Sequence, residues 1–152
     1  MKATGALALS LFPMAVMASD CVSNAPAFSP QTSSFAATCS PGETIVHVAK
    51  SKSPVVKLDF PSDQEVTIST SSGAKSSGGN GHGAQVCIWQ SWDMGKPCGA
   101  SAVSQDGFND WNGNASCGVK VPKGIQYVRA LQVNSNADEQ NTTITIVCRR
   151  NG

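Results

Sequence analysis

Charged and aromatic residues are scarce in this sequence. Of its 152 residues, 14% are charged and 6% are aromatic, and the formal net charge is +1. Proteins that bind nucleic acids or anionic membrane surfaces do so through clustered Lys and Arg side chains. The sequence has no such cluster, and we therefore expect neither kind of partner.

Long hydrophobic runs are also lacking. The apolar stretch after Lys2 is interrupted by Pro13, is too short to span a bilayer, and ends in small residues at Ala18. This pattern predicts a signal peptide, residues 1–18, and a secreted, extracellular protein of residues 19–152. No later segment reaches the roughly 18 apolar residues that a membrane helix needs, so we expect no membrane insertion.

The six cysteines all follow residue 18, and an even number in an exported chain predicts three disulfides. Their spacing lacks the close pairs of a zinc site, so we expect no bound metal and no cofactor. Six cysteines allow many pairings. We favour a bond between Cys87 and Cys98 that closes a hairpin-like loop, and a bond from Cys148 to an earlier segment. The cysteines are Cys21, Cys39, Cys87, Cys98, Cys117 and Cys148.

Short runs of β-branched and alternating apolar residues predict strands, and no segment has the pattern of an amphipathic helix. About seven strands separated by turn residues favour an all-β protein, an antiparallel β-sandwich of the jelly-roll type, which we expect to be a monomer of one domain. The expected strands lie within residues 45–48, 55–60, 65–70, 86–89, 118–121, 126–133 and 142–148.

Three segments lack this strand pattern. Residues 19–43 are rich in Ser, Pro, Ala and Thr and predict an extended N-terminal arm held by its two cysteines. Residues 71–83 contain five glycines and predict a mobile loop, and residues 91–116 predict a long region of turns.

The order of four short motifs resembles the pre-peptidase C-terminal type of bacterial jelly-roll module. These motifs are Val-Thr-Ile-Ser at 66–69, Val-Cys-Ile-Trp at 86–89, a Val-Pro-x-Gly-x-x-Tyr-Val segment at 121–128 and a Thr-rich strand at 142–147. The resemblance covers residues 65–148, and it implies a sandwich used for adhesion or carbohydrate binding rather than for catalysis. In size and cysteine content the chain also looks like the small effectors that fungi secrete.

The three tryptophans fall within residues 89–111. Trp89 lies in an apolar strand and is expected in the core. Trp92 and Trp111 adjoin polar, glycine-containing sequence, where an exposed ring would suit stacking on a sugar. Together with the polar residues between them, they form the predicted ligand-binding surface: Trp92, Asp106, Asn109, Asp110, Trp111 and Asn112.

The carboxylates and amides of this region invite two further interpretations. Asp110, Asn112 and Asn114 imitate the start of an EF-hand loop, but Ala115 replaces its glycine and Val121 its glutamate, so we reject an EF-hand. A looser calcium site stays open, beside the simpler interpretation that these side chains cap turns. Asp106 with Asp110 would be the acid pair of a glycosidase, but two acids in one loop are usually solvated surface.

No catalytic signature is present. The two histidines, His47 and His82, stand outside any recognisable catalytic motif, and the sequence has neither G-x-S-x-G nor H-E-x-x-H. We therefore expect no enzyme activity. Asn114 and Asn141 begin Asn-x-Ser/Thr sequons and are candidate glycosylation sites.

The sequence thus predicts a secreted, disulfide-stabilised binding protein, an effector or adhesion-like factor with a role in virulence. Its partner would be a cell-surface or wall glycan, or an extracellular host protein. The alternative is an inhibitor or toxin that acts through the exposed loop at residues 71–83, and a small hydrolase is the third candidate.

Overall fold

The computed structural model describes residues 21–22, 35–51, 53–75, 85–105, 110–133 and 139–149. For residues 74, 75, 104, 105, 110, 111 and 139 it describes the backbone alone. The predicted signal peptide, residues 1–18, and its cleavage site lie outside the described residues.

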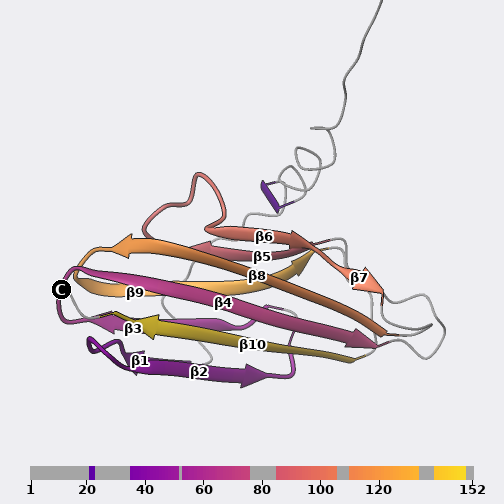
Figure 1. The fold of residues 1–152 in the computed structure, drawn as a ribbon, viewed down its shortest axis with the longest axis horizontal. Coiled ribbons are helices and arrows are strands. Elements are labelled where there is room, and N and C mark those ends of the chain that lie inside the picture. The colour runs from indigo at the N-terminus through magenta and orange to yellow at the C-terminus, as the bar shows by residue number, and fades with distance from the viewer. Residues whose placement is uncertain are drawn as a thin grey trace, which may run out of the picture.

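Two five-stranded sheets pack face to face, and the expected all-β sandwich with three disulfides is confirmed (Figure 1). Within the described residues there are ten strands rather than about seven. The first sheet, in the order β1-β3-β9-β5-β6, contains β1 (Phe35–Thr38), β3 (Val55–Phe60), β9 (Gly124–Val133), β5 (Gln85–Gln90) and β6 (Gly99–Ala102). The second, in the order β2-β10-β4-β8-β7, contains β2 (Thr44–Ala49), β10 (Glu139–Cys148), β4 (Gln64–Lys75), β8 (Asp110–Val121) and β7 (Ser104–Gln105).

Neighbouring strands run antiparallel except β1 and β3, which are parallel. Residues 122–123 join β8 to β9, which begins at Gly124. Gly124 there has φ +123°, a backbone conformation that L side chains rarely adopt.

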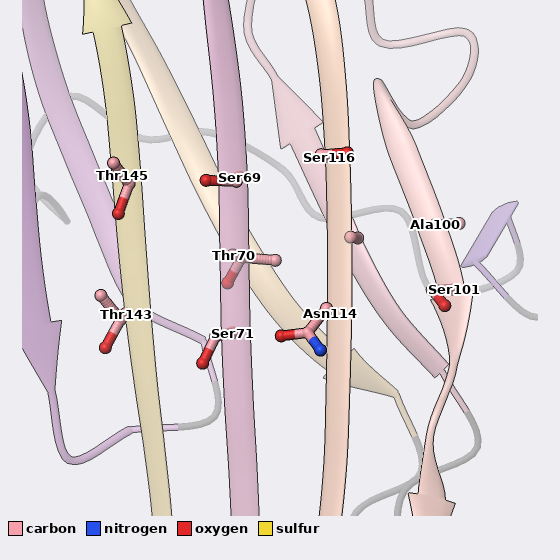
Figure 2. A pocket seen from close by; sticks show the side chains of 10 residues that line it. Ser69, Thr70, Ser71, Ala100, Ser101, Asn114, Ser116, Thr143 and Thr145 are labelled. Atoms are coloured by element: carbon pink, nitrogen blue, oxygen red, sulfur yellow. The ribbon is translucent and has the colours of Figure 1, made fainter.

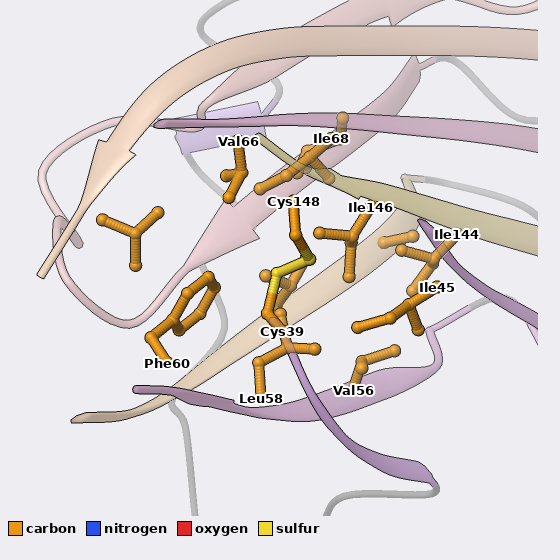
Figure 3. Packing of buried hydrophobic residues seen from close by; sticks show 14 of the residues in the cluster. Cys39, Ile45, Val56, Leu58, Phe60, Val66, Ile68, Ile144, Ile146 and Cys148 are labelled. Atoms are coloured by element: carbon orange, nitrogen blue, oxygen red, sulfur yellow. A yellow bond between two sulfur atoms is a disulfide. The ribbon is translucent and has the colours of Figure 1, made fainter. Parts of the chain in front are cut away.

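The main core lies between the sheets and follows from the alternation of side chains along each strand. β4 turns Val66 and Ile68 inward, β10 turns Ile144 and Ile146 inward, and the opposite sheet supplies residues such as Phe60. Figure 3 shows these side chains around the disulfide between Cys39 and Cys148. Because a strand presents every second residue to each face, the residues between these positions point to the outer face of the second sheet.

A second, smaller cluster covers the outer face of β5. Val86 and Ile88 belong to the main core, whereas Cys87 and Trp89 pack with Cys21 and Val133 on the other side of the strand. Trp89 is 0% exposed, which confirms its expected place in a core.

The pairing of the disulfides differs in part from expectation. Cys148 bonds to Cys39, as the prediction of a link to an earlier segment requires. The expected bond between Cys87 and Cys98 is wrong, because Cys87 bonds to Cys21 and Cys98 bonds to Cys117.

Strand register explains the error. Cys87 lies opposite Ala100 on β6, two residues beyond Cys98. Diagonal neighbours in a sheet are about 7–8 Å apart, which exceeds the usual reach of a disulfide.

Two segments that were expected to be loops are partly strand. Residues 71–75 continue β4, and residues 110–116 open β8; residues 71–75 pair with residues 110–114. Their Ser, Gly and Asn residues have low strand propensity, but β10 and β8 bond to β4 from both sides. Pairing on both edges outweighs the local preference. Residues 76–83 of the expected loop lie outside the described residues.

Within the described residues, no helix has the length and apolar character needed to cross a membrane.

Removal of single disulfides tests their unequal roles. Cys39 and Cys148 are 109 residues apart, and Cys98 and Cys117 are 19 apart. Chain-entropy arguments give about 4.7 kcal/mol for a loop of about 100 residues and about 3 kcal/mol for one of about 15. We expect the Cys39→Ala/Cys148→Ala variant to lose more free energy of unfolding in urea than Cys98→Ala/Cys117→Ala, and equal losses would contradict this ranking.

Candidate functional site

The outer face of the second sheet carries a shallow pocket of about 450 Å³ (Figure 2). It spans β10, β4 and β8 and is bordered on one side by β6 of the first sheet. We call it the Ser/Thr pocket; its lining residues are Ser69, Thr70, Ser71, Ala100, Ser101, Asn114, Ala115, Ser116, Thr143 and Thr145.

The strand register aligns the lining side chains in two rows across β10, β4 and β8. Ser69 of β4 lies between Thr145 of β10 and Ser116 of β8, and these three residues form one row across the sheet. A second row, made by Thr143, Ser71 and Asn114, lies two residues further along the strands. Figure 2 shows the two rows side by side.

The β6 border is held by a disulfide and by a glycine. The bond between Cys98 and Cys117 ties the residue before β6 to β8. A Cβ at Gly99 would lie 2.6 Å from the backbone oxygen of Ser116, so only glycine permits the two strands to come this close. This approach places Ala100 and Ser101 beside the two rows.

The polar side chains of the two rows do not contribute hydrogen bonds to the fold in the part of the chain that the structure describes. Among the residues that the structure describes, they make no hydrogen bond, whereas Ser101 donates to the carbonyl oxygen of Ala102 at 3.4 Å. The lining side chains that the structure describes contain only hydroxyl, amide and methyl groups, so none of them is charged. The pocket therefore presents neutral groups that can bind a ligand, and the hydroxyls and the amide can each both donate and accept a hydrogen bond.

The described residues show no metal site, and the pKa of one of them, Arg129, is lowered. Within them, no three His, Cys, Asp or Glu side chains are grouped so that they could hold a metal ion. Arg129 lies on β9 of the opposite sheet, where it donates from Nη1 to Ser53 Oγ at 3.0 Å. Its partial burial lowers the pKa of the guanidinium by desolvation.

The structure places the predicted binding residues in different surroundings. Trp92 is half-buried and packs against the main core, with its ring edge-on to Phe60 at a centroid distance of 6.5 Å. Asp106 and Asn109 lie outside the described residues.

The other three predicted binding residues open β8. Asp110 and Trp111 pair with Lys75 and Ala74 through their backbones. The side chain of Asn112 is exposed on the outer face of the sheet, next to Asn114 along the strand. Of the six predicted residues, Asn112 is thus the one whose described side chain shares a face with the Ser/Thr pocket.

Both sequons lie on this same face. Asn114 is exposed and lines the pocket. Asn141 is exposed on β10, two residues along the strand from Thr143. Whether either asparagine carries a glycan remains a prediction from sequence.

Sequence reasoning missed most residues of the pocket. Ser69, Ser71, Thr143 and Thr145 appeared as polar positions of amphipathic strands or of a loop. A local signal was present at Thr143 and Thr145, which are the hydroxyl members of the alternating Thr-Ile-Thr-Ile run at 143–146. That pattern does not reveal which strands are neighbours, and their adjacency is what creates the pocket.

No protein-family model matches the chain, and comparison with curated proteins gives no match. Solved structures similar to the chain include the pre-peptidase C-terminal domain of a collagenase from Bacillus anthracis, the type of module that the sequence resembles. Its identity is 11% and its TM-score is 0.42, with 78% of this chain and 99% of that domain covered.

Two further similar structures come from proteins whose names refer to carbohydrates. A family 35 carbohydrate binding module from Clostridium thermocellum has 12% identity and a TM-score of 0.42, covering 68% of this chain and 90% of that one. A β-glucosidase from Paenibacillus barengoltzii has 10% identity and a TM-score of 0.46, covering 74% of this chain. The chain spans only 11% of the β-glucosidase. Similarities at this level assign no function.

Two glycine variants test the β6 border. In Gly99→Ala the new Cβ would meet the backbone of Ser116 at 2.6 Å, whereas in Gly118→Ala it would meet nothing within 4 Å. Overpacking of this kind costs about 1–3 kcal/mol, so we expect Gly99→Ala to lose about that much free energy of unfolding. The control Gly118→Ala should stay within about 0.5 kcal/mol of the wild type. Urea unfolding measures both, and a neutral Gly99→Ala would contradict the close approach.

Proposed function

We propose that the protein is an exported, disulfide-stabilised module that binds a neutral glycan in the Ser/Thr pocket. The observation that supports this most directly is the set of six adjacent hydroxyl and amide side chains that make no hydrogen bond within the described part of the chain. A sugar presents hydroxyl groups that can take up these donors and acceptors. The absence of charge from the pocket lining favours a neutral ligand over a uronic or sulfated one.

The pocket lining favours binding over catalysis. General acid–base catalysis needs a group that can exchange a proton, and glycoside hydrolysis ordinarily needs two carboxylates. The lining residues are Ser, Thr, Asn and Ala, and none of them supplies such a group at ordinary pH.

The export of the protein and its biological role belong to the same proposal. Three disulfides fit an oxidising compartment, and residues 1–18 have the pattern of a signal peptide. A secreted module that binds a wall or surface glycan would be retained at the cell that displays it, as an effector or adhesion-like factor requires.

Substitution of Ser71, at the centre of one row, tests the site. We expect Ser71→Arg to lower the affinity for neutral polysaccharides at least about tenfold, because the new side chain fills the pocket and is charged. The control Thr38→Arg changes an exposed residue of β1 in the other sheet. Binding to a panel of immobilised neutral polysaccharides is measured after circular dichroism has shown that both variants fold. Equal binding by the two variants would place the site elsewhere.

The pH dependence separates this pocket from the acidic loop that the sequence suggested. Because no side chain of the pocket lining titrates, we expect affinity to stay constant from about pH 5 to about pH 9 and to be insensitive to EDTA. A site that depended on carboxylates, such as those of Asp106 and Asp110, would instead weaken in acid, because carboxylates gain protons there. Such a loss in protein that remains folded would favour the acidic loop.

A further inference from the structure

The hydrogen-bonding groups of the Ser/Thr pocket are regularly spaced both across the strands and along them. These spacings limit which ligands fit. Adjacent strands lie about 4.8 Å apart, and residues two apart on one strand lie about 6.7 Å apart. The row of Thr145, Ser69 and Ser116 therefore offers one group at each strand spacing. The second row repeats this pattern in parallel.

The shorter repeat is close to the length of one sugar unit in an extended β-linked chain. Such a chain is a ribbon of pyranose rings with hydroxyl groups along both edges. When it lies across the strands, each edge follows one row and each successive ring meets the next strand. α-1,4-linked chains coil, and their rings do not stay between two straight rows.

The ends of the rows determine how many rings are held. On one side the rows meet Ala100 and Ser101 of β6, where Gly99 brings that strand against β8. On the other side, beyond β10, the positions that continue them on β2 are Val46 and Val48. These two side chains are exposed but offer no hydrogen bond. Hydrogen-bonding side chains thus exist at four strands: β8, β4 and β10 of the second sheet and, through the Ser101 hydroxyl, β6 of the first sheet.

From this arrangement we infer that the ligand is an extended, neutral, β-linked glycan that lies across the strands and occupies the pocket with about four sugar units. This inference rests on the proposed function. The lining residues that the structure describes include no aromatic side chain, so hydrogen bonds must supply most of the affinity. Affinity should therefore grow with each unit until the rows are filled.

Calorimetry with oligosaccharides of two to six units tests the inference on the full mature protein. The probes are β-1,4-linked glucose and β-1,4-linked N-acetylglucosamine, with α-1,4-linked glucose of equal length as the comparison. We expect at least one β-linked series to gain about three- to tenfold in affinity per unit up to four units. Further units should change affinity by less than about twofold, and the α-linked series should bind at least about tenfold more weakly at four units.

A pair of Thr→Val variants tests the orientation of the chain. Thr145 lies on β10, at the far end of one row, and Thr145→Val should weaken binding of the four-unit ligand about three- to tenfold while leaving the two-unit ligand unaffected. The control Thr44→Val removes an exposed hydroxyl from β2 on the same sheet, outside the pocket, and should change neither.

The outcomes separate this inference from the proposed function. Equal affinity for α- and β-linked chains, or affinity independent of length, would overturn the inference and leave glycan binding in place. Failure of these probes and of all immobilised neutral polysaccharides would overturn both.

Discussion

The alternation of side chains along β4, β8 and β10 is the constraint on which both the core and the Ser/Thr pocket depend. Burial of Val66, Ile68 and Ile146 between the sheets directs Ser69, Ser71 and Thr145 to the outer face. A slip of one residue in any of these strands would expose the apolar side chains and bury the hydroxyls. The hydrophobic effect therefore fixes the positions of polar side chains that make no contact with the core.

Two disulfides and one glycine add covalent and steric restraints that fix how the sheets and β6 lie against one another. The Cys39–Cys148 bond links the end of β10 to the residue after β1, and so joins the two sheets within the core. The Cys98–Cys117 bond and Gly99 hold β6 against β8 at the surface. One link thus serves the packing of the layers, and the other shapes the border of the pocket.

The features that could be predicted from the sequence are those that depend on neighbouring residues along the chain. Alternating β-branched runs located most strands, and the cysteine count predicted three disulfides. What it missed depends on which strands are neighbours. Residues 71–75 and 110–114 have the composition of loops and become strands because they pair with each other. Cys87 and Cys98 are close in sequence, but the register places Cys87 opposite Ala100.

The candidate site was missed for the same reason. Ser69, Asn114 and Thr145 are unremarkable as single residues, and they form a site only because β8, β4 and β10 are adjacent in that register. Tryptophan and aspartate side chains, in contrast, suggest binding or catalysis even as single residues. Trp92, with its ring against Phe60, shows that an aromatic residue in turn-rich sequence can pack against the core.

Because Asn114 lies in the pocket and begins a sequon, access to the pocket depends on whether the producing cell glycosylates this residue. A secretory pathway that glycosylates Asn-x-Ser/Thr sequons would attach an oligosaccharide to Asn114, where a ligand would otherwise lie. It would attach a second one nearby, at Asn141. A cell without that machinery would release the same polypeptide with the pocket open. Identical sequences from two expression hosts would then differ in whether they can bind at all, and a mass measurement of the intact chain would distinguish them.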